Sequence, residues 1–192
     1  MTRIIILAAI MCAAAISTLA QRDYLTDQEV ELVRDAQQID KRIDVLTHAI
    51  DRRFAVLKIN VSAPLFKENP DQWGPPPEGT RQQLLFDIRR ILQKAIDDID
   101  NLSERPSSMV IDEPDPKTKK KPEGFNELFP RAVRSLGAAA ARYKGPLKHE
   151  LDAPGDGQEK GSIMNSLDMC EEITAAVGKL SKPSVEQKKT DH

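Results

Sequence analysis

Hydrophobic residues recur at alternating steps of three and four along the first third of the chain. The series is Leu32, Ala36, Ile39, Ile43, Leu46, Ile50 and Leu57, with Phe54 beside it. This spacing puts them on one face of an α-helix, close to the pattern of a coiled coil. Thr26 and Glu29 have the spacing of a capping box, which marks a helix start. The pattern predicts one long helix from Thr26 to Leu57 whose outer face carries Arg34, Asp35, Asp40, Lys41, Arg42, Asp44, Asp51, Arg52 and Arg53.

Three further helices are predicted by the same spacing. Thr80 with Gln83 repeats the capping box and opens the second helix, which extends to Leu102. The third runs from about Asn126 to Tyr143 and is interrupted at Gly145-Pro146, and the fourth covers Ile163 to Leu180. No alternating apolar run of useful length predicts a strand. Amphipathic helices without a sheet bury their apolar faces against each other, so we expect an all-α fold, an antiparallel bundle of about four helices.

Proline-rich segments separate these helices. Residues 61–79 and 104–124 are predicted loops, and the second carries the basic run Lys117, Lys119, Lys120 and Lys121. A cluster of Pro and Gly at residues 152–157 separates the third helix from the fourth. The prediction is therefore a single helical domain over residues 21–182, followed by a flexible tail over residues 183–192.

The N-terminus has the three parts of a secretory signal. Met1-Thr2-Arg3 is short and basic, Ile4 to Ile16 is apolar without a charge, and Ser17-Thr18-Leu19-Ala20 offers small residues for cleavage. The apolar run is shorter than the roughly 20 residues that span a bilayer. We therefore expect a signal peptide over residues 1–20, cleaved after Ala20, and a periplasmic or secreted protein with no stable membrane anchor.

Composition narrows the range of partners and cofactors. The 192 residues carry a formal net charge of −2, so no overall positive field would attract nucleic acid. Cys12 lies in the signal segment, so Cys170 is the single thiol of the processed chain and no internal disulfide is expected. Haem-attachment, Glu-x-x-His, P-loop and nucleophile-elbow patterns are missing, so no cofactor, metal or catalytic residue is predicted.

Three groups of residues could carry chemistry of their own, and each is expected to have an ordinary role. Asp44 and His48 lie one turn apart and are expected to face solvent as a pair. Met164, Met169 and Cys170 could in principle hold Cu(I), but they suit a core better, and Cys170 is expected to be a buried, inert thiol. The carboxylates of Asp97, Asp98 and Asp100 are either a cation site or, as we favour, neutralised by the Lys117–Lys121 run or hydrated.

The loop before the second helix contains Trp73, the chain's single tryptophan, next to Pro75, Pro76 and Pro77. Interfaces are enriched in Trp, and proline-rich segments are pre-extended, so this loop is a candidate surface for a protein partner. It could equally cover one end of the bundle. The pattern leaves both interpretations open.

The opening of the processed chain resembles two groups of exported proteins. Asp23-Tyr24-Leu25-Thr26-Asp27-Gln28-Glu29, continuing through Arg34–Arg42, resembles exported helical proteins of acidobacteria, over about residues 22–57. That resemblance implies a bacterial periplasmic protein and carries no activity with it. Leu25-Thr26 followed by Glu29 is also similar to the Leu-Thr-x-x-Gln of the periplasmic stress chaperones related to Spy, with Glu in place of Gln.

We expect an exported, non-enzymatic helical protein that acts by binding another protein, through the Trp73 loop or an apolar groove between helices. A stress chaperone or metal-responsive sensor is the first alternative, and an enzyme of unrecognised type is the second.

Overall fold

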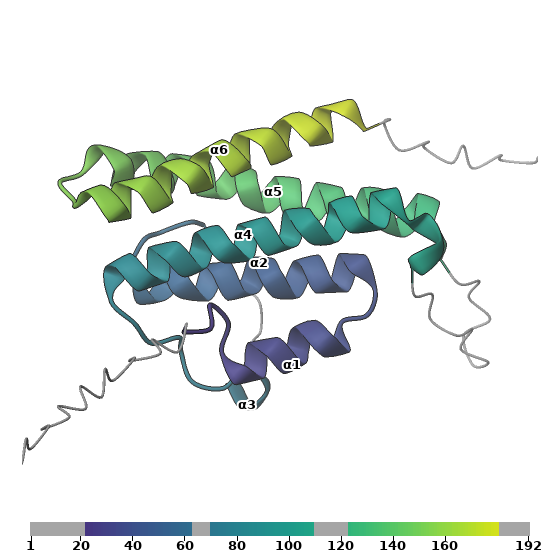
Figure 1. Ribbon diagram of the computed structural model, residues 1–192, viewed down its shortest axis with the longest axis horizontal. Helices are drawn as coiled ribbons and strands as arrows, with labels where there is room; N and C mark the ends of the chain where they lie inside the picture. Colours follow the sequence, from purple (N-terminus) through teal and green to yellow (C-terminus); the bar gives the residue numbers. More distant parts are fainter. Residues whose placement is uncertain (1–21, 63–69, 110–122, 181–192) are drawn as a thin grey trace, which may run out of the picture.

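A computed structural model describes residues 22–62, 70–109 and 123–180 of the chain (Figure 1). The helices are α1 (Asp27–Asp35), α2 (Ile39–Val56), α3 (Pro70–Trp73), α4 (Arg81–Glu104), the 3₁₀ helix η1 (Pro106–Ser108), α5 (Phe125–Asp152) and α6 (Gly157–Lys179). The described residues contain no strand, which confirms the all-α prediction. The predicted signal peptide, the Lys117–Lys121 run and the predicted tail lie outside them.

The long helices α2, α4, α5 and α6 form the bundle (Figure 1). Consecutive helices are antiparallel, as expected, so that α2 with α4 and α5 with α6 make two helical hairpins. The hairpins lie side by side in the same orientation, which makes α2 parallel to α5. Two ion pairs between α2 and α5 show the parallel direction: Arg131 contacts Asp40 at 3.0 Å and Arg142 contacts Asp51 at 3.3 Å. The second pair lies the same number of residues further along both helices.

The core between these helices is aliphatic, as the composition indicates. Its fully buried members include Ile43, Leu46 and Ile50 from α2, Leu92 and Ala95 from α4, and Leu128 and Leu147 from α5. Two aromatic residues are also part of this core: the ring centres of Phe54 and Tyr143 lie 5.2 Å apart. The buried hydroxyl of Tyr143 donates to the backbone oxygen of Thr47 at 3.0 Å. The predicted apolar stripes thus do bury their side chains against one another.

The prediction of a single helix from Thr26 to Leu57 is wrong. The capping box of Thr26 and Glu29 is present, but the helix ends at Asp35 and a new one starts at Ile39. After the break α1 lies antiparallel to α2, beside it (Figure 1). A straight helix would carry residues 27–35 past the bundle and leave Val30 and Val33 in water, whereas the folded-back helix packs both against the core.

The predicted interruption at Gly145-Pro146 is also wrong. Helix α5 continues through both residues to Asp152. Pro146 cannot donate to the carbonyl four residues earlier, which usually bends or breaks a helix. Here Tyr143 and Leu147, one on each side, are both fully buried, so packing holds the helix on its path. The breaker cluster after it is confirmed, and Asp156 caps α6 by accepting from the amides of Gln158 and Glu159.

Helices α5 and α6 approach closely where Gly137 meets Val177. A Cβ atom built on Gly137 would lie 2.3 Å from Cγ2 of Val177. Only a glycine allows this distance between the two helices. None of the described helices is long and apolar enough to cross a membrane.

Candidate functional site

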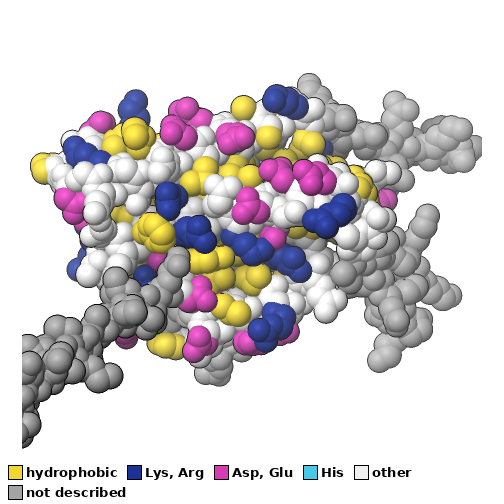
Figure 2. Space-filling model, viewed as in Figure 1, with side chains coloured by type: hydrophobic (Ala, Val, Ile, Leu, Met, Phe, Trp, Pro, Cys, Tyr) yellow, Lys and Arg dark blue, Asp and Glu magenta, His cyan; other side chains and the backbone are white. Residues whose placement is uncertain are grey.

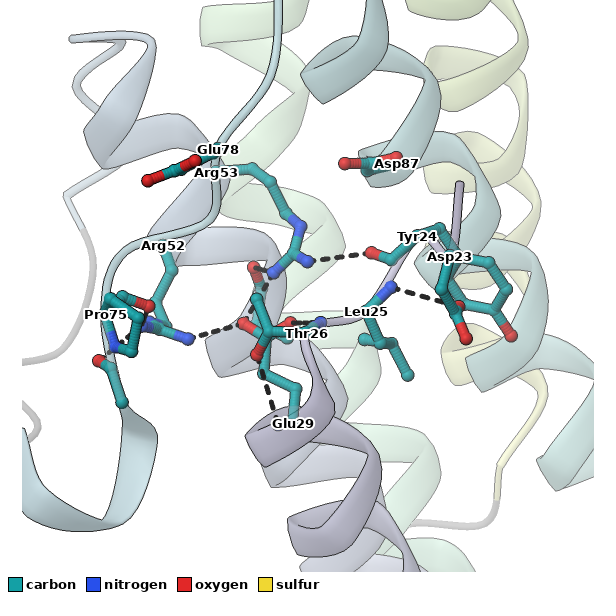
Figure 3. Close-up of polar contacts among 12 residues, drawn as sticks. Asp23, Tyr24, Leu25, Thr26, Glu29, Arg52, Arg53, Pro75, Glu78 and Asp87 are labelled. Atoms are coloured by element: carbon teal, nitrogen blue, oxygen red, sulfur yellow. Dashed lines mark hydrogen bonds and ion pairs between the residues drawn. The ribbon is translucent and has the colours of Figure 1, made fainter. Parts of the chain in front are cut away.

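A buried cluster of charges ties one end of the bundle together (Figure 3). Glu29 at the start of α1 has no exposed surface. Its Oε1 accepts from Nη1 of Arg52 at 2.7 Å and from Nη1 of Arg53 at 2.6 Å, and its Oε2 accepts from the amide of Thr26 at 3.0 Å. One carboxylate therefore caps its own helix and fastens that helix to the last turn of α2.

The two arginines extend the cluster to the backbone around it. Arg53 donates to the carbonyls of Ala49 and Tyr24 at 2.8 and 2.7 Å. Arg52 donates to the carbonyls of Gly74 and Pro75 at 3.1 and 2.6 Å. Burial raises the pKa of Glu29, but the hydrogen bond and charge of Arg53, the Thr26 amide and the charge of Arg52 outweigh it, so that pKa lies below its ordinary value of 4.5.

This arrangement corrects the predicted outer face of the first helix. Four of its nine charged residues are buried, namely Asp40, Asp51, Arg52 and Arg53. Helix α2 packs against α1, α4 and α5, so more than its apolar stripe is covered. Charged side chains beside the stripe therefore also lie between helices. Each buried charge has an opposite charge from another helix.

The Trp73 loop packs onto this end of α2. The ring of Trp73 lies 4.2 Å from the ring of His48, edge to face, and 5.5 Å from the guanidinium carbon of Arg52. Pro77 is buried, and Pro75 and Pro76 are exposed. The loop therefore does cover this end of the bundle. A partner-binding role for Trp73, Pro75, Pro76 and Pro77 stays a prediction.

His48 is buried, so the predicted solvent-facing pair with Asp44 is wrong. Asp44 is exposed and accepts from the hydroxyl of Ser135 on α5 at 2.6 Å. The two residues are one turn apart, but the Trp73 loop covers the side of α2 that carries His48. The spacing of residues along one helix cannot predict that a distant loop covers His48.

Arg22 connects the cluster to α4. Its guanidinium donates to both carboxylate oxygens of Asp87, at 3.0 and 2.8 Å, and to the carbonyl of Glu78 at 2.5 Å. Asp87 is almost completely buried, and this burial raises its pKa above 3.8 against the opposing effect of Arg22. Since Arg22 binds both oxygens, the carboxylate serves as an anchor for the N-terminal segment.

Beyond Asp87 a groove runs between α4 and α6; we call it the α4–α6 groove. Its first cavity, of about 490 Å³, is lined by Arg22, Gln82, Gln83, Phe86, Asp87, Arg89, Gln158, Gly161, Ser162 and Asn165. Its second, of about 350 Å³, is lined by Arg89, Arg90, Gln93, Asn165, Asp168, Met169 and Glu172. The two share Arg89 and Asn165, so they form one continuous depression. Figure 2 shows basic side chains over α4 on the face that Figure 1 also presents.

Arg89 and Arg90 line the α4 side of this groove, and neither has a carboxylate partner among the described residues. The guanidinium carbon of Arg89 lies 4.7 Å from the ring centre of Phe86, and that of Arg90 lies 5.3 Å from the ring centre of Tyr24. The Nε of Arg89 is buried and has no acceptor among the described residues. Phe86 itself is 38% exposed, one of the few large hydrophobic side chains that are.

An apolar hollow where α4, α5 and α6 meet is much smaller. Ile96, Ile99, Val133, Leu136, Ile173 and Ala176 are its apolar lining, and its volume is about 90 Å³. Ligand pockets usually measure about 300–1,000 Å³. The larger groove of the described residues is thus lined by arginines and side-chain amides, and the apolar hollow is below the usual size of a ligand pocket; a role for an apolar groove stays a prediction.

The acidic cluster on α4 is held by its own helix. Asp98 pairs with Lys94, and Asp97 accepts from the side-chain amide of Gln93 at 2.9 Å. Burial, followed by the charges of Glu172, Asp97 and Glu104, raises the pKa of Asp100. In the part of the chain that the structure describes, no group of three His, Cys, Asp or Glu side chains could hold a metal ion. The lysine run expected to neutralise these acids lies outside that part.

Cys170 is fully buried, as predicted, and burial raises the pKa of its thiol to about 12. Met164, in contrast, is 52% exposed. The two residues therefore do not face a common site, and the soft-metal alternative has no geometry to support it.

No protein family, curated protein or solved structure in the comparisons matches this chain. The candidate site therefore has to be interpreted from its own geometry.

Proposed function

We propose that the chain is an exported, non-catalytic protein that binds an extended polypeptide segment in the α4–α6 groove. The observation that carries this proposal is the elongated shape of the groove. Gln82 lines one end and Gln93 the other, and eleven residues of helix span about 16 Å. An extended chain advances roughly 3.3 Å per residue, so about five residues fit along it.

The lining suits a peptide backbone. Five side-chain amides face the groove, those of Gln82, Gln83, Gln93, Gln158 and Asn165. Four of them use one group within the chain: Gln82 donates to Gln158, Gln93 donates to Asp97, and Gln83 accepts from Thr80. Their other groups, with the amide of Asn165, can pair with peptide N–H and C=O groups. The walls are two long helices joined at one end by the hydrogen bond between Gln82 and Gln158 and by the ion pair between Arg81 and Glu159. Peptide binding to these helices therefore does not require loops of the protein to become ordered, which would cost free energy.

A binding role is favoured over a catalytic one by the state of the reactive groups near the groove. The buried carboxylate of Asp87 has both oxygens engaged by Arg22, so it is not free to act as a general base. The thiol of Cys170 lines neither cavity of the groove and is buried. The lining offers hydrogen bonds and charge, which recognition uses.

Export is the second part of the proposal and rests on the N-terminal pattern of residues 1–20. Expressed from its own start codon in a Gram-negative host, the protein is expected in the periplasmic fraction with Gln21 as its first residue. Mass spectrometry of the intact protein measures this directly. A cytoplasmic protein that still begins at Met1 would contradict it.

Two glycines of α6 allow a matched test of the groove. Gly161 lines the groove, Gly178 does not, and an added Cβ meets nothing within 4 Å at either position. Gly161→Trp should fill the groove and Gly178→Trp should leave it open, while both exchange a poor helix former for a better one. Selection of displayed peptides by the wild-type protein supplies the ligands for fluorescence titration.

Gly161→Trp is expected to weaken peptide binding at least about tenfold, or 1.4 kcal/mol, while Gly178→Trp binds like the wild-type protein. Circular dichroism melting of both variants shows whether the bundle is intact. Equal affinity of the two variants, or no peptide enriched by the wild-type protein, would exclude the groove as the binding surface.

A further inference from the structure

Arg89, at the middle of the groove, differs in its ion pairing from four nearby arginines. Arg22, Arg52, Arg53 and Arg81 all donate to carboxylates of the chain. Within the described residues Arg89 pairs with no carboxylate, and it lines both cavities of the groove. An arginine that lines a cavity without an anionic partner favours a ligand that brings one.

We propose that Arg89 binds a carboxylate of the segment in the α4–α6 groove, so that the protein selects peptides with an acidic residue. This inference rests on the proposed function and names the chemistry that its ligand carries. A carboxylate accepts two parallel hydrogen bonds from two N–H groups of one arginine, a geometry that lysine cannot offer. Because the Nε of Arg89 is buried, its two Nη groups are the donors for a carboxylate in the groove.

The surroundings of Arg89 fix its guanidinium. Its carbon lies 4.7 Å from the ring centre of Phe86, an attraction that holds the cation over the ring. Arg89 also lines both cavities, so a carboxylate bound there would lie near the centre of the groove. Asn165 lines the same two cavities from α6. It places an amide where the peptide backbone on either side of the acidic residue would pass.

The charges along the groove restrict the ligand to few negative groups. Arg89 and Arg90 stand on α4, and Asp168 and Glu172 stand on α6, so these four formal charges cancel. Arg22 and Asp87 form an ion pair of their own at 2.8 Å. A polyanion such as a nucleic acid would meet the two acids on α6 and be repelled. A single carboxylate that approaches along α4 meets a positive charge without that cost.

The test compares Arg89→Gln with the wild-type protein on peptides that the wild-type protein selects. The most enriched acidic peptide is synthesised with its Asp or Glu, and again with Asn or Gln in that place. Arg89→Gln is expected to weaken binding of the acidic peptide roughly ten- to a hundredfold, as loss of a charged hydrogen bond does. The amide peptide should bind both proteins equally weakly, and Arg89→Lys should restore only part of the affinity.

Arg34→Gln serves as the control, since Arg34 is exposed and its ion pair with Glu31 lies at the surface, outside the groove. Melting temperatures of all variants confirm that they fold. If Gly161→Trp abolishes binding but Arg89→Gln does not, or if the selected peptides lack acidic residues, the assignment of Arg89 is overturned and the groove stands. If Gly161→Trp has no effect, the groove and the Arg89 assignment fall together.

Discussion

Replacing Glu29 with Gln is expected to lower the free energy of unfolding by about 3–5 kcal/mol, the usual cost of removing one member of a buried ion pair. Arg52 and Arg53 both donate to one oxygen of Glu29, and their side chains are only 8% and 1% exposed. Without the carboxylate, two buried positive charges face each other with only backbone carbonyls to solvate them. Urea denaturation at pH 7, followed by circular dichroism, measures the change.

Gln is the informative substitution because it preserves the capping box. A Gln at the third helical position can accept the same hydrogen bond from the amide of Thr26. Its NH2 group then replaces the oxygen that accepts from the two arginines, so the loss reports on that contact, its charge and its hydrogen bonds together. Glu31→Gln, two residues later on the same helix, is the control. Its carboxylate is 59% exposed and pairs with Arg34, and such surface pairs contribute about 0–1 kcal/mol. Equal effects of the two substitutions would show that Glu29 does not fasten α1 to α2.

The pH dependence of the difference gives a second signature. The pKa of Glu29 is lowered in the folded protein from its ordinary value of 4.5. Its contribution to stability is therefore complete above pH 4.5 and is lost as the pH falls through the lowered pKa. The gap between the wild-type protein and Glu29→Gln should shrink below pH 4.5. Asp87, whose pKa is raised, adds a slope of the opposite sign to both proteins, and this slope largely cancels in the difference.

Gly137→Ala is expected to destabilise the bundle by about 1–3 kcal/mol, the range for overpacking a core. The new methyl group would lie 2.3 Å from Cγ2 of Val177, and a valine in a helix has essentially one side-chain rotamer, so it cannot turn away. The better helix propensity of alanine offsets about 1 kcal/mol at most. The clash is therefore expected to dominate, and α6 has to move away from α5.

Two controls separate the clash from the change in propensity. Gly161 lies inside α6, is not followed by a proline and has open space around it, so Gly161→Ala should be neutral or stabilising by up to about 1 kcal/mol. Val177→Ala should rescue most of the loss when it is combined with Gly137→Ala, which a double-mutant cycle quantifies. A neutral Gly137→Ala would mean that the helices are farther apart than the structure has them.

Local signals in the sequence predicted the capped starts of α1 and α4 and the buried stripe of α2 correctly. The capping boxes of Thr26 and Thr80 depend on residues three positions apart, and both are present. The apolar stripe from Ile43 to Ile50 is fully buried. Such features follow from neighbours along one helix, so the spacing of a few residues was sufficient to find them.

The errors come from contacts between segments distant in the sequence. The three-and-four spacing passes unbroken through Ala36 and Ile39, so nothing local marks the end of α1. Packing of Tyr143 and Leu147 carries α5 across Pro146, which local propensity alone would treat as a break. The burial of Arg52 and Arg53 depends on α1 folding back onto α2. These are tertiary effects that overrule local preference.

The groove could not be predicted for a related reason. Its lining combines α4 residues, such as Arg89, with α6 residues about 75 positions later, such as Asn165. Only the parallel packing of these two helices brings them together. The sequence contains one usable hint: Phe86 lies outside the apolar stripe of α4, and Arg89 and Arg90 follow it three and four positions later on the same side, a combination that suits a binding surface. Trp73 was predicted as the interface residue instead, and its ring packs against His48.

The chain's single tryptophan makes a direct test of the α4–α6 groove possible. In a nuclear magnetic resonance titration with a selected peptide, the indole N–H of Trp73 reports on the Trp73 loop, and the side-chain amides of Gln158 and Asn165 report on the groove. We expect the two amide signals to shift in proportion to bound peptide while the indole signal stays in place. A shift of the indole signal with unchanged amide signals would contradict the account.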